Sequence, residues 1–348
     1  DGDAGNAARS RDGREGGRCV MLKKLRLGSF RQLGLLLFII VLCALVQLSN
    51  NKFIDGTNIA SIFTNTAIIA ILAIGMLIVM LTGGIDLSIG SNIALSGMVA
   101  ALHVMTNPGV PPILLILEGM LTGLVCGSMI GLLVSRLNML PIIASLGMNY
   151  VFHGVVFLLS GGQWVSAHQM SDAFKAIAIG KFLDINNLVV IAAVIHLVAQ
   201  YFLNYTRTGR RFYAVGSNGE AARVAGIDSV KTKFQAYAIM GALAGLAGVL
   251  WVSKFASAQP DTATGYEINI IAACVIGGVS IAGGSGKVSG VLLGSLLIGI
   301  INNALPLINF VSEFSKNLIQ GLIILFAVLL NTLVKRRAEY SALLRRQI

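Results

Sequence analysis

The fold is decided by residues 206–234, TRTGRRFYAVGSNGEAARVAGIDSVKTKF, the longest polar interruption in the second half of a very apolar chain. Long apolar segments flank this stretch on both sides. Its basic side chains outnumber its acidic ones: Arg207, Arg210, Arg211, Arg223, Lys231 and Lys233 against Glu220 and Asp228. A short loop this basic between two membrane spans faces the cytoplasm. The stretch therefore predicts a cytoplasmic loop over residues 205–233, with one short helix at 219–225.

The composition indicates a polytopic helical membrane protein. The chain has 348 residues, of which 55% are hydrophobic and 12% charged, and its mean hydropathy is +0.81. A soluble protein would have about 25% charged residues, whereas about 20 apolar residues are enough for one helical span. The net charge of +11 does not indicate nucleic-acid binding, because no soluble domain is present to carry a basic face.

Ten apolar segments are long enough to be considered as spans. They are residues 33–49, 59–81, 88–105, 112–134, 140–160, 187–204, 234–252, 267–282, 288–305 and 317–334. The Gly-rich fragments 82–91 and 283–287 are either breaks within longer elements or partial re-entrant passes, which leaves a range of eight to eleven spans. Small residues at every fourth position, as at Gly123 and Gly127 or Gly241 and Gly245, predict closely packed helices. The expected fold class is an all-α integral membrane protein with about ten transmembrane helices.

The distribution of basic residues predicts that both ends of the chain face the cytoplasm (N-in, C-in). With ten spans in this orientation, most Lys and Arg residues fall in inner segments. The outer segments then hold Lys52, Lys175, Lys181, Lys254 and Lys316.

Two parts of the chain are distinguished. Residues 1–20 are rich in Gly, Arg and Asp and have no apolar period, so we expect a disordered or non-native N-terminal extension. Residues 21–348 form a single transmembrane domain.

The run LTGGIDLSIGS at 81–91 places Asp86 beside two glycines at a span boundary. A carboxylate near the membrane core is a functional candidate by default. Asp86 can instead accept hydrogen bonds from the backbone N–H groups of Ser88 and Ile89 and cap the following helix. Gly83 and Gly84 allow the chain to break before it. We therefore predict a structural joint made by Gly83, Gly84, Asp86 and Ser88, with direct proton or ion binding as the alternative.

Polar side chains within apolar segments are candidates for a solute path. Asn65, Thr66, Asn149, Asn302 and Asn303 lie in predicted spans. Such residues most often make hydrogen bonds between helices, but they also offer the donors and acceptors that a polyhydroxylated solute needs. The shortage of intramembrane acids and bases favours a neutral solute.

The sequence predicts no catalytic or metal site. Cys43, Cys126 and Cys274 lie in apolar runs without CxxC spacing and are expected to be small buried hydrophobes. The segment GGSGKVSG at 283–290 resembles a phosphate loop, but Ile281 and Val288 occupy positions where a Walker A motif requires Gly and Ser or Thr. We expect no nucleotide site and no cofactor on this chain.

Four stretches together resemble one family, the permease subunits of bacterial ABC importers for ribose, rhamnose and autoinducer-2. They are LTGGIDLSIGS at 81–91, GRRFYAVGSNGEAARVAGI at 209–227, SAQPDTATGYEINIIAACVIGGVSIAGGSGKVSG at 257–290 and INNALPLI at 301–308. The resemblance covers residues 33 to 335. It implies a fold similar to the larger-type importers, such as the vitamin B12 permease, and a location in the bacterial inner membrane.

The resemblance also implies partners and a point of contact. The partners are a second permease subunit, identical or related, two cytoplasmic ATP-binding subunits that use the ATP, and a periplasmic sugar-binding protein. Such permeases place a cytoplasmic coupling helix at the positions of Glu220, Ala221, Ala222, Arg223 and Gly226 in this sequence. When the ATPases close, this helix would be displaced and would tilt the spans.

Two other functions are alternatives to an importer permease. An ion-coupled secondary sugar transporter would need an ionisable pair near the midplane of the membrane. The only candidate for such a pair in the sequence is Asp86 with a histidine. A membrane-embedded transferase acting on lipid-linked sugars would need a cluster of acidic metal ligands, which the sequence does not show. The favoured function is a permease without enzymatic activity that imports a monosaccharide or a related solute.

Overall fold

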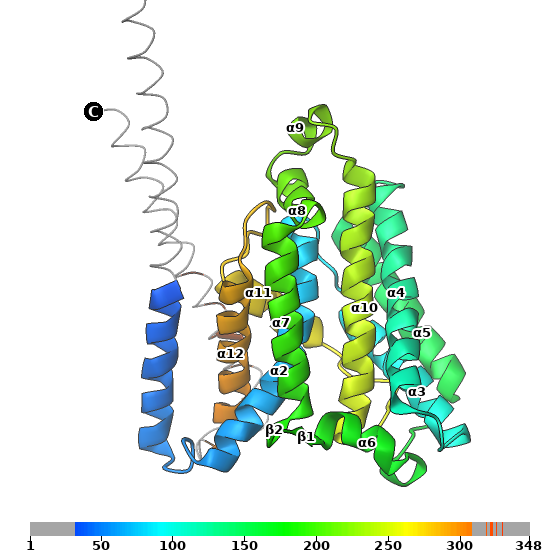
Figure 1. Cartoon of the computed structure of the whole chain (residues 1–348), viewed down its shortest axis with the longest axis vertical. Helices are drawn as coiled ribbons and strands as arrows, with labels where there is room; N and C mark the ends of the chain where they lie inside the picture. The colour runs from blue at the N-terminus through cyan, green and yellow to red at the C-terminus, as the bar shows by residue number, and fades with distance from the viewer. Residues whose placement is uncertain (1–31, 308–317, 319–320, 323–324, 326–328, 330–348) are drawn as a thin grey trace, which may run out of the picture.

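The computed structural model describes residues 32–307 and, beyond them, residues 318, 321–322, 325 and 329. Within this part of the chain, eight helices are long and apolar enough to cross a membrane. They are Gln32–Ser49, α2 (Gly56–Leu81), α3 (Ile89–Thr106), α4 (Pro112–Ser135), α5 (Pro141–Ser160), α7 (Asn187–Tyr205), α10 (Ser229–Phe255) and the helix Val288–Leu307, which comprises α12 (Val288–Ala304) and a 3-10 turn. They form the bundle in Figure 1.

Shorter elements lie at the two ends of the bundle. One end carries α8 (Arg207–Ser217) and α9 (Gly219–Val224). The opposite end carries α6 (Asp172–Ile179) and a small hairpin of β1 (Lys181–Phe182) and β2 (Ile185–Asn186), as Figure 1 shows. The all-α architecture is confirmed at this level. The N-in, C-in orientation stays a prediction.

One predicted span is wrong. The predicted span 267–282 is helical only as far as Ile276, in α11 (Tyr266–Ile276), a helix of 11 residues, which is about 16 Å long at 1.5 Å per residue. The hydrocarbon core of a bilayer is about 30 Å thick, so α11 crosses only part of that thickness. The helix ends at Ile276, and the chain turns back over residues 280–285, where the N–H of Ser280 donates to the carbonyl of Ser285 at 2.8 Å. The predicted span 317–334 and the tail 1–20 lie outside the described residues.

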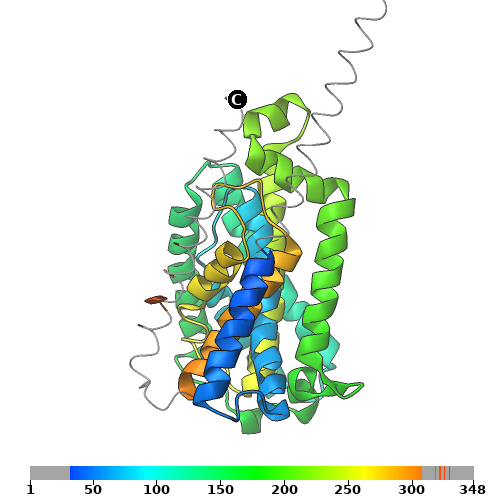
Figure 2. The same ribbon diagram turned by 90° about the vertical axis from the view of Figure 1, so that its left-hand side faces the viewer.

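The core of the bundle is built around α2 and α10. In their most apolar windows, 83% of α2 and 78% of α10 is buried, against 11% of Gln32–Ser49 and 22% of α5. Figure 2 shows Gln32–Ser49 on the outside of the bundle. The weakly buried helices leave apolar side chains such as Leu158 and Leu197 exposed, as expected for helices that face lipid.

Glycines bring α4 and α10 into backbone contact. A Cβ atom added at Gly123 would collide with the carbonyl oxygen of Gly241, and one added at Gly241 would collide with that of Gly123. Gly127 and Gly245 are in similar close contact with the opposite helix. Small residues at this spacing allow helices to pack closely in lipid. The predicted tight packing is confirmed for this pair of helices.

The break between α2 and α3 is a buried joint. Gly83 adopts φ 79°, and a Cβ atom at Gly84 would stand 2.5 Å from the hydroxyl oxygen of Tyr237. The hydroxyl of Tyr237 donates to the carbonyl of Ile85 at 3.2 Å. Asp86 is 2% exposed, and its Oδ1 accepts from the backbone N–H of Ser88 at 2.8 Å and from the Ser88 hydroxyl at 2.7 Å.

The capping geometry differs from the sequence prediction in one respect. Ser88, not Asp86, occupies the N-cap position of α3. Both hydrogen bonds to Asp86 come from Ser88, because the carboxylate closes a local turn before the helix begins.

Candidate functional sites at the two ends of the bundle

The predicted basic loop contains two helices. α8 follows α7 directly, and the Thr206 hydroxyl oxygen accepts from the N–H of Gly209 at 3.0 Å to cap it. One face of α8 buries Gly209, Phe212 and Val215, whereas its arginines at 207, 210 and 211 are exposed. This helix was not predicted from the sequence. The spacing of its buried residues, every third position, is the signal that could have identified it.

The short helix predicted at 219–225 is present as α9. The Asn218 side chain accepts from the N–H of Ala221 at 3.0 Å and caps its start. Its end is closed by Gly226, which has φ 77° and whose N–H donates to the carbonyl of Arg223 at 3.0 Å. Glycine is favoured here because the left-handed conformation costs other residues free energy.

One side of α9 is exposed. Ala222 is buried, whereas Val224 is 88% exposed. The Glu220 carboxylate pairs with the Arg223 guanidinium at 3.1 Å, and both side chains are largely exposed. A cavity of about 480 Å³ is lined by residues from α8, α9, the end of α2 and the start of α10, among them Gly216, Glu220, Arg223 and Lys233.

α8 also contacts two parts of the bundle that are distant in the sequence. A Cβ atom at Gly216 would collide with the carbonyl oxygen of Leu81, the last residue of α2. The same carbonyl accepts from the N–H of Gly284 at 2.9 Å. The Tyr213 hydroxyl donates to the carbonyl of Gly286 at 3.1 Å, and burial raises the pKa of Tyr213. α8 therefore holds the end of α2 and the loop between α11 and α12 together.

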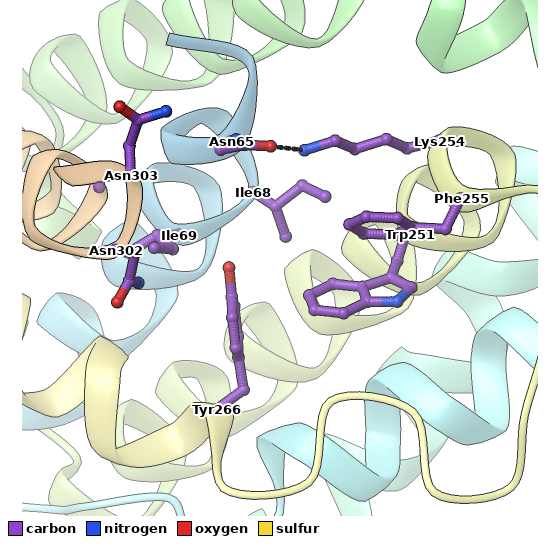
Figure 3. A pocket seen from close by; sticks show the side chains of 10 residues that line it. Asn65, Ile68, Ile69, Trp251, Lys254, Phe255, Tyr266, Asn302 and Asn303 are labelled. Carbon is purple, nitrogen blue, oxygen red and sulfur yellow. Dashed lines mark hydrogen bonds between the residues drawn. The ribbon is translucent and has the colours of Figure 1, made fainter. Parts of the chain in front are cut away.

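The second candidate site is a cavity of about 170 Å³ toward the opposite end of the bundle (Figure 3). Three predicted path residues meet in it: Asn65 from α2, and Asn302 and Asn303 from α12. Their side chains lie around the same space although the two helices are more than 200 residues apart in the sequence. Asn303 also exchanges amide hydrogen bonds of 3.1 Å with Asn58.

The remaining polar and aromatic walls come from the end of α10 and the start of α11. The ammonium of Lys254 donates to Oδ1 of Asn65 at 2.6 Å and to the carbonyl of Thr64 at 3.4 Å. The rings of Trp251 and Tyr266 meet edge to face, with centroids 5.0 Å apart and an interplanar angle of 88°. The Lys254 nitrogen lies 5.0 Å from the centroid of the Phe255 ring.

Two predicted path residues do not line this cavity. Thr66 is buried, with its hydroxyl against Gly299 of α12. Asn149 lies on α5, which packs on α3 and α4. Trp251, Lys254 and Tyr266 were not predicted as cavity residues. Lys254 was expected in an outer loop, but α10 continues to Phe255 and places this lysine in its last turn.

Groups of three or more His, Cys, Asp or Glu side chains that could hold a metal ion are absent from the described residues. Cys126 and Cys274 are buried and free. The thiol of Cys274 donates to the carbonyl of Ala73 at 3.3 Å.

The fold and the two sites define a polytopic membrane permease. Residues 58–328 match the family described as the permease component of the branched-chain amino acid transport system, and the chain belongs to this family. It is a transport permease and not an enzyme, and it is a multi-pass protein of the inner membrane.

Relatives of the chain include sugar permeases. The ribose import permease protein RbsC of Escherichia coli K12 is 38% identical over 298 residues, which cover 85% of this chain and 92% of the relative. RbsC of Bacillus subtilis is 37% identical over 304 residues, 87% of this chain and 94% of the relative. The L-arabinose ABC transporter permease protein AraH of Azospirillum brasilense is 34% identical over 296 residues, 85% of this chain and 86% of the relative. No solved structure matches the chain. The family predicted from the four sequence stretches is thereby confirmed.

Proposed function

We propose that the protein is the membrane-embedded permease of an ABC importer that carries a monosaccharide, or a related polyhydroxylated solute, from a periplasmic binding protein into the cytoplasm. The observation that carries the proposal is the likeness to ribose and arabinose permeases along nearly their whole length. The cavity of amide and aromatic side chains supports the same class of solute, because hydroxyl groups need hydrogen-bond donors and acceptors and not charges alone.

The partners follow from the kind of transporter. Two permease subunits, identical or related, would form the pathway, and two ATP-binding subunits would bind on the cytoplasmic side. The sequence-predicted contact residues Glu220, Ala221, Arg223 and Gly226 lie on or directly after α9, on an exposed helix that projects from the bundle (Figure 1). Ala222 faces inward and would act by holding α9 in place.

The contacts of α8 suggest how movement of α9 would reach the bundle. α9 follows α8 after one residue, Asn218. α8 in turn touches Leu81 at the end of α2 and is bonded to the loop that precedes α12. α2 and α12 carry the asparagines of the cavity. A displacement of α9 would therefore tilt the helices that line the path, which is a rigid-body transition between two packings.

Reconstitution tests this function. Vesicles that contain the permease with its ATPase, and that receive the binding protein outside and ATP on the ATPase side, should accumulate radiolabelled D-ribose or L-arabinose. Vesicles with a hydrolysis-deficient ATPase should not. Accumulation by the permease alone under a proton gradient would instead support an ion-coupled secondary transporter.

A further inference from the structure

Lys254 is a charged side chain in a place where the solute would pass. Ten residues line the cavity of about 170 Å³. Apart from Tyr266, Lys254 is the only one of these ten with an ionisable side chain. Its hydrogen-bond partners are an amide and a backbone carbonyl. Among the described residues it forms no ion pair with a carboxylate. A partly buried charge that contacts only neutral dipoles and the Phe255 ring, with no counter-charge, costs free energy, so a structural role alone is a poor explanation for it.

The ammonium has donor capacity to spare. A lysine has three N–H donors, and the bonds to Asn65 and Thr64 use two of them, the second at the long distance of 3.4 Å. The bond to Asn65 also orients that amide, because its Oδ1 faces the ammonium and its NH₂ group is left to other acceptors. Lys254 and Asn65 together therefore present N–H donors suited to the vicinal hydroxyl oxygens of a sugar.

The aromatic side chains supply the complementary apolar surface. The Trp251 and Tyr266 rings form a corner at the cavity wall (Figure 3). A sugar ring has one or two apolar C–H faces and a polar edge. The two aromatic rings can contact an apolar face, while the N–H donors opposite them bind the hydroxyl groups of the edge. Pockets for drug-sized ligands have volumes of about 300 Å³ or more. The smaller volume here suits a single monosaccharide.

We propose that the permease itself binds the sugar during transit, and that Lys254 is the specificity-determining residue of this transit site, donating to sugar hydroxyls opposite the Trp251–Tyr266 corner. This inference rests on the proposed function. It goes beyond that function because it assigns selection to the membrane subunit as well as to the external binding protein. The positive charge of the protonated Lys254 also disfavours cationic amino sugars at the same place.

Direct binding to the purified full-length chain tests the inference. Equilibrium dialysis with radiolabelled D-ribose, or with L-arabinose if the reconstituted transporter prefers it, should show saturable binding. Lys254→Met should weaken binding about tenfold or more, which corresponds to about 1.4 kcal/mol. Lys254→Arg should largely restore it. Lys181→Met, at an exposed position in β1 away from the cavity, is the matched control and should bind as the unaltered chain does.

Tryptophan fluorescence tests whether the sugar binds next to Trp251. The chain has two tryptophans, and Trp164 is 62% exposed in a loop, so Trp164→Phe leaves Trp251 as the reporter. Sugar should change this emission saturably in Trp164→Phe, and about tenfold more sugar or higher should be needed for the same change in Trp164→Phe/Lys254→Met. Gel filtration of each variant establishes that it is folded.

The outcomes distinguish failure of the proposed transit site from failure of the proposed transport function. Equal sugar binding by Lys254→Met and the unaltered chain, or no saturable binding by the unaltered chain, overturns the transit site even if the complete transporter accumulates the sugar. Failure of the complete transporter to accumulate any sugar overturns the proposed function itself.

Discussion

Gly216 of α8 lies directly against the carbonyl oxygen of Leu81, the residue at which α2 ends. The same oxygen accepts a hydrogen bond of 2.9 Å from the N–H of Gly284. Three segments that are far apart in the sequence therefore meet at one backbone carbonyl. In the proposed mechanism, movement of the basic loop is transmitted to the helices of the bundle at this point.

Gly216→Ala tests that junction. The added methyl group cannot be accommodated by a side-chain rotation, because the atoms it would meet belong to the backbone. We expect sugar uptake by the reconstituted transporter to fall at least tenfold, while the variant still inserts into the membrane. Gly147→Ala is the matched control, since nothing lies within 4 Å of a Cβ atom at Gly147. Full uptake by Gly216→Ala would show that this junction transmits no movement.

Gly226→Val should disturb the end of α9. Gly226 has φ 77°, and a residue with a side chain pays about 1–2 kcal/mol in this conformation, most for a β-branched one. We expect the ATPase of the complex to hydrolyse ATP with much less sugar uptake per ATP. Gly226→Asn should be milder, because asparagine tolerates the left-handed region better. The ratio of uptake to ATP hydrolysis measures the effect, and an unchanged ratio in both variants would contradict the role of α9.

Glu220→Ala should separate partner binding from folding. The Glu220–Arg223 pair is exposed, and exposed pairs contribute about 0–1 kcal/mol to stability. The thermal midpoint of the purified chain should therefore barely change. We expect recovery of the ATPase subunit with the permease in mild detergent to fall several-fold. Asp172→Ala removes an exposed carboxylate that pairs with Lys175 on α6 at the opposite end of the bundle, and as the control it should leave this recovery unchanged.

Asp86→Ala should destabilise the chain. It removes an acceptor of two hydrogen bonds from Ser88 in a buried joint, and a buried polar group left without its partner costs about 1–3 kcal/mol. Asp86→Asn retains one side-chain oxygen and should cost less, and Ser88→Ala, which removes only the hydroxyl, should be intermediate. Thermal unfolding in detergent measures the series. A variant that keeps its stability but loses a proton flux would favour the ion-coupled alternative.

The parts of the fold that depend on local sequence could be predicted. α9 lies between two glycines and is capped by Asn218, so its bounds are close to those expected. The apolar runs of most spans are long enough to identify their helices within a few residues. α8 was not predicted because its arginines make the segment polar overall, although Phe212 and Val215 form a narrow apolar face.

The parts that depend on contacts across the bundle could not be predicted. Hydropathy does not show that α11 ends at Ile276, because residues 276–282 continue the apolar run. Asn65, Asn302 and Asn303 were conspicuous as polar residues in apolar runs. Lys254 was not, because its role depends on α10 extending past it toward Asn65 on α2.

The most direct measurement of the central claim is the accessibility of α9 from the two sides of the membrane. In a variant without the native cysteines, Val224→Cys introduces a thiol at a position that is 88% exposed. A membrane-impermeant maleimide should label it in inside-out vesicles and not in right-side-out vesicles, and addition of the ATPase subunits should protect it. Labelling in right-side-out vesicles would place α9 outside the cell and would contradict an import permease moved through this helix by cytoplasmic ATPases.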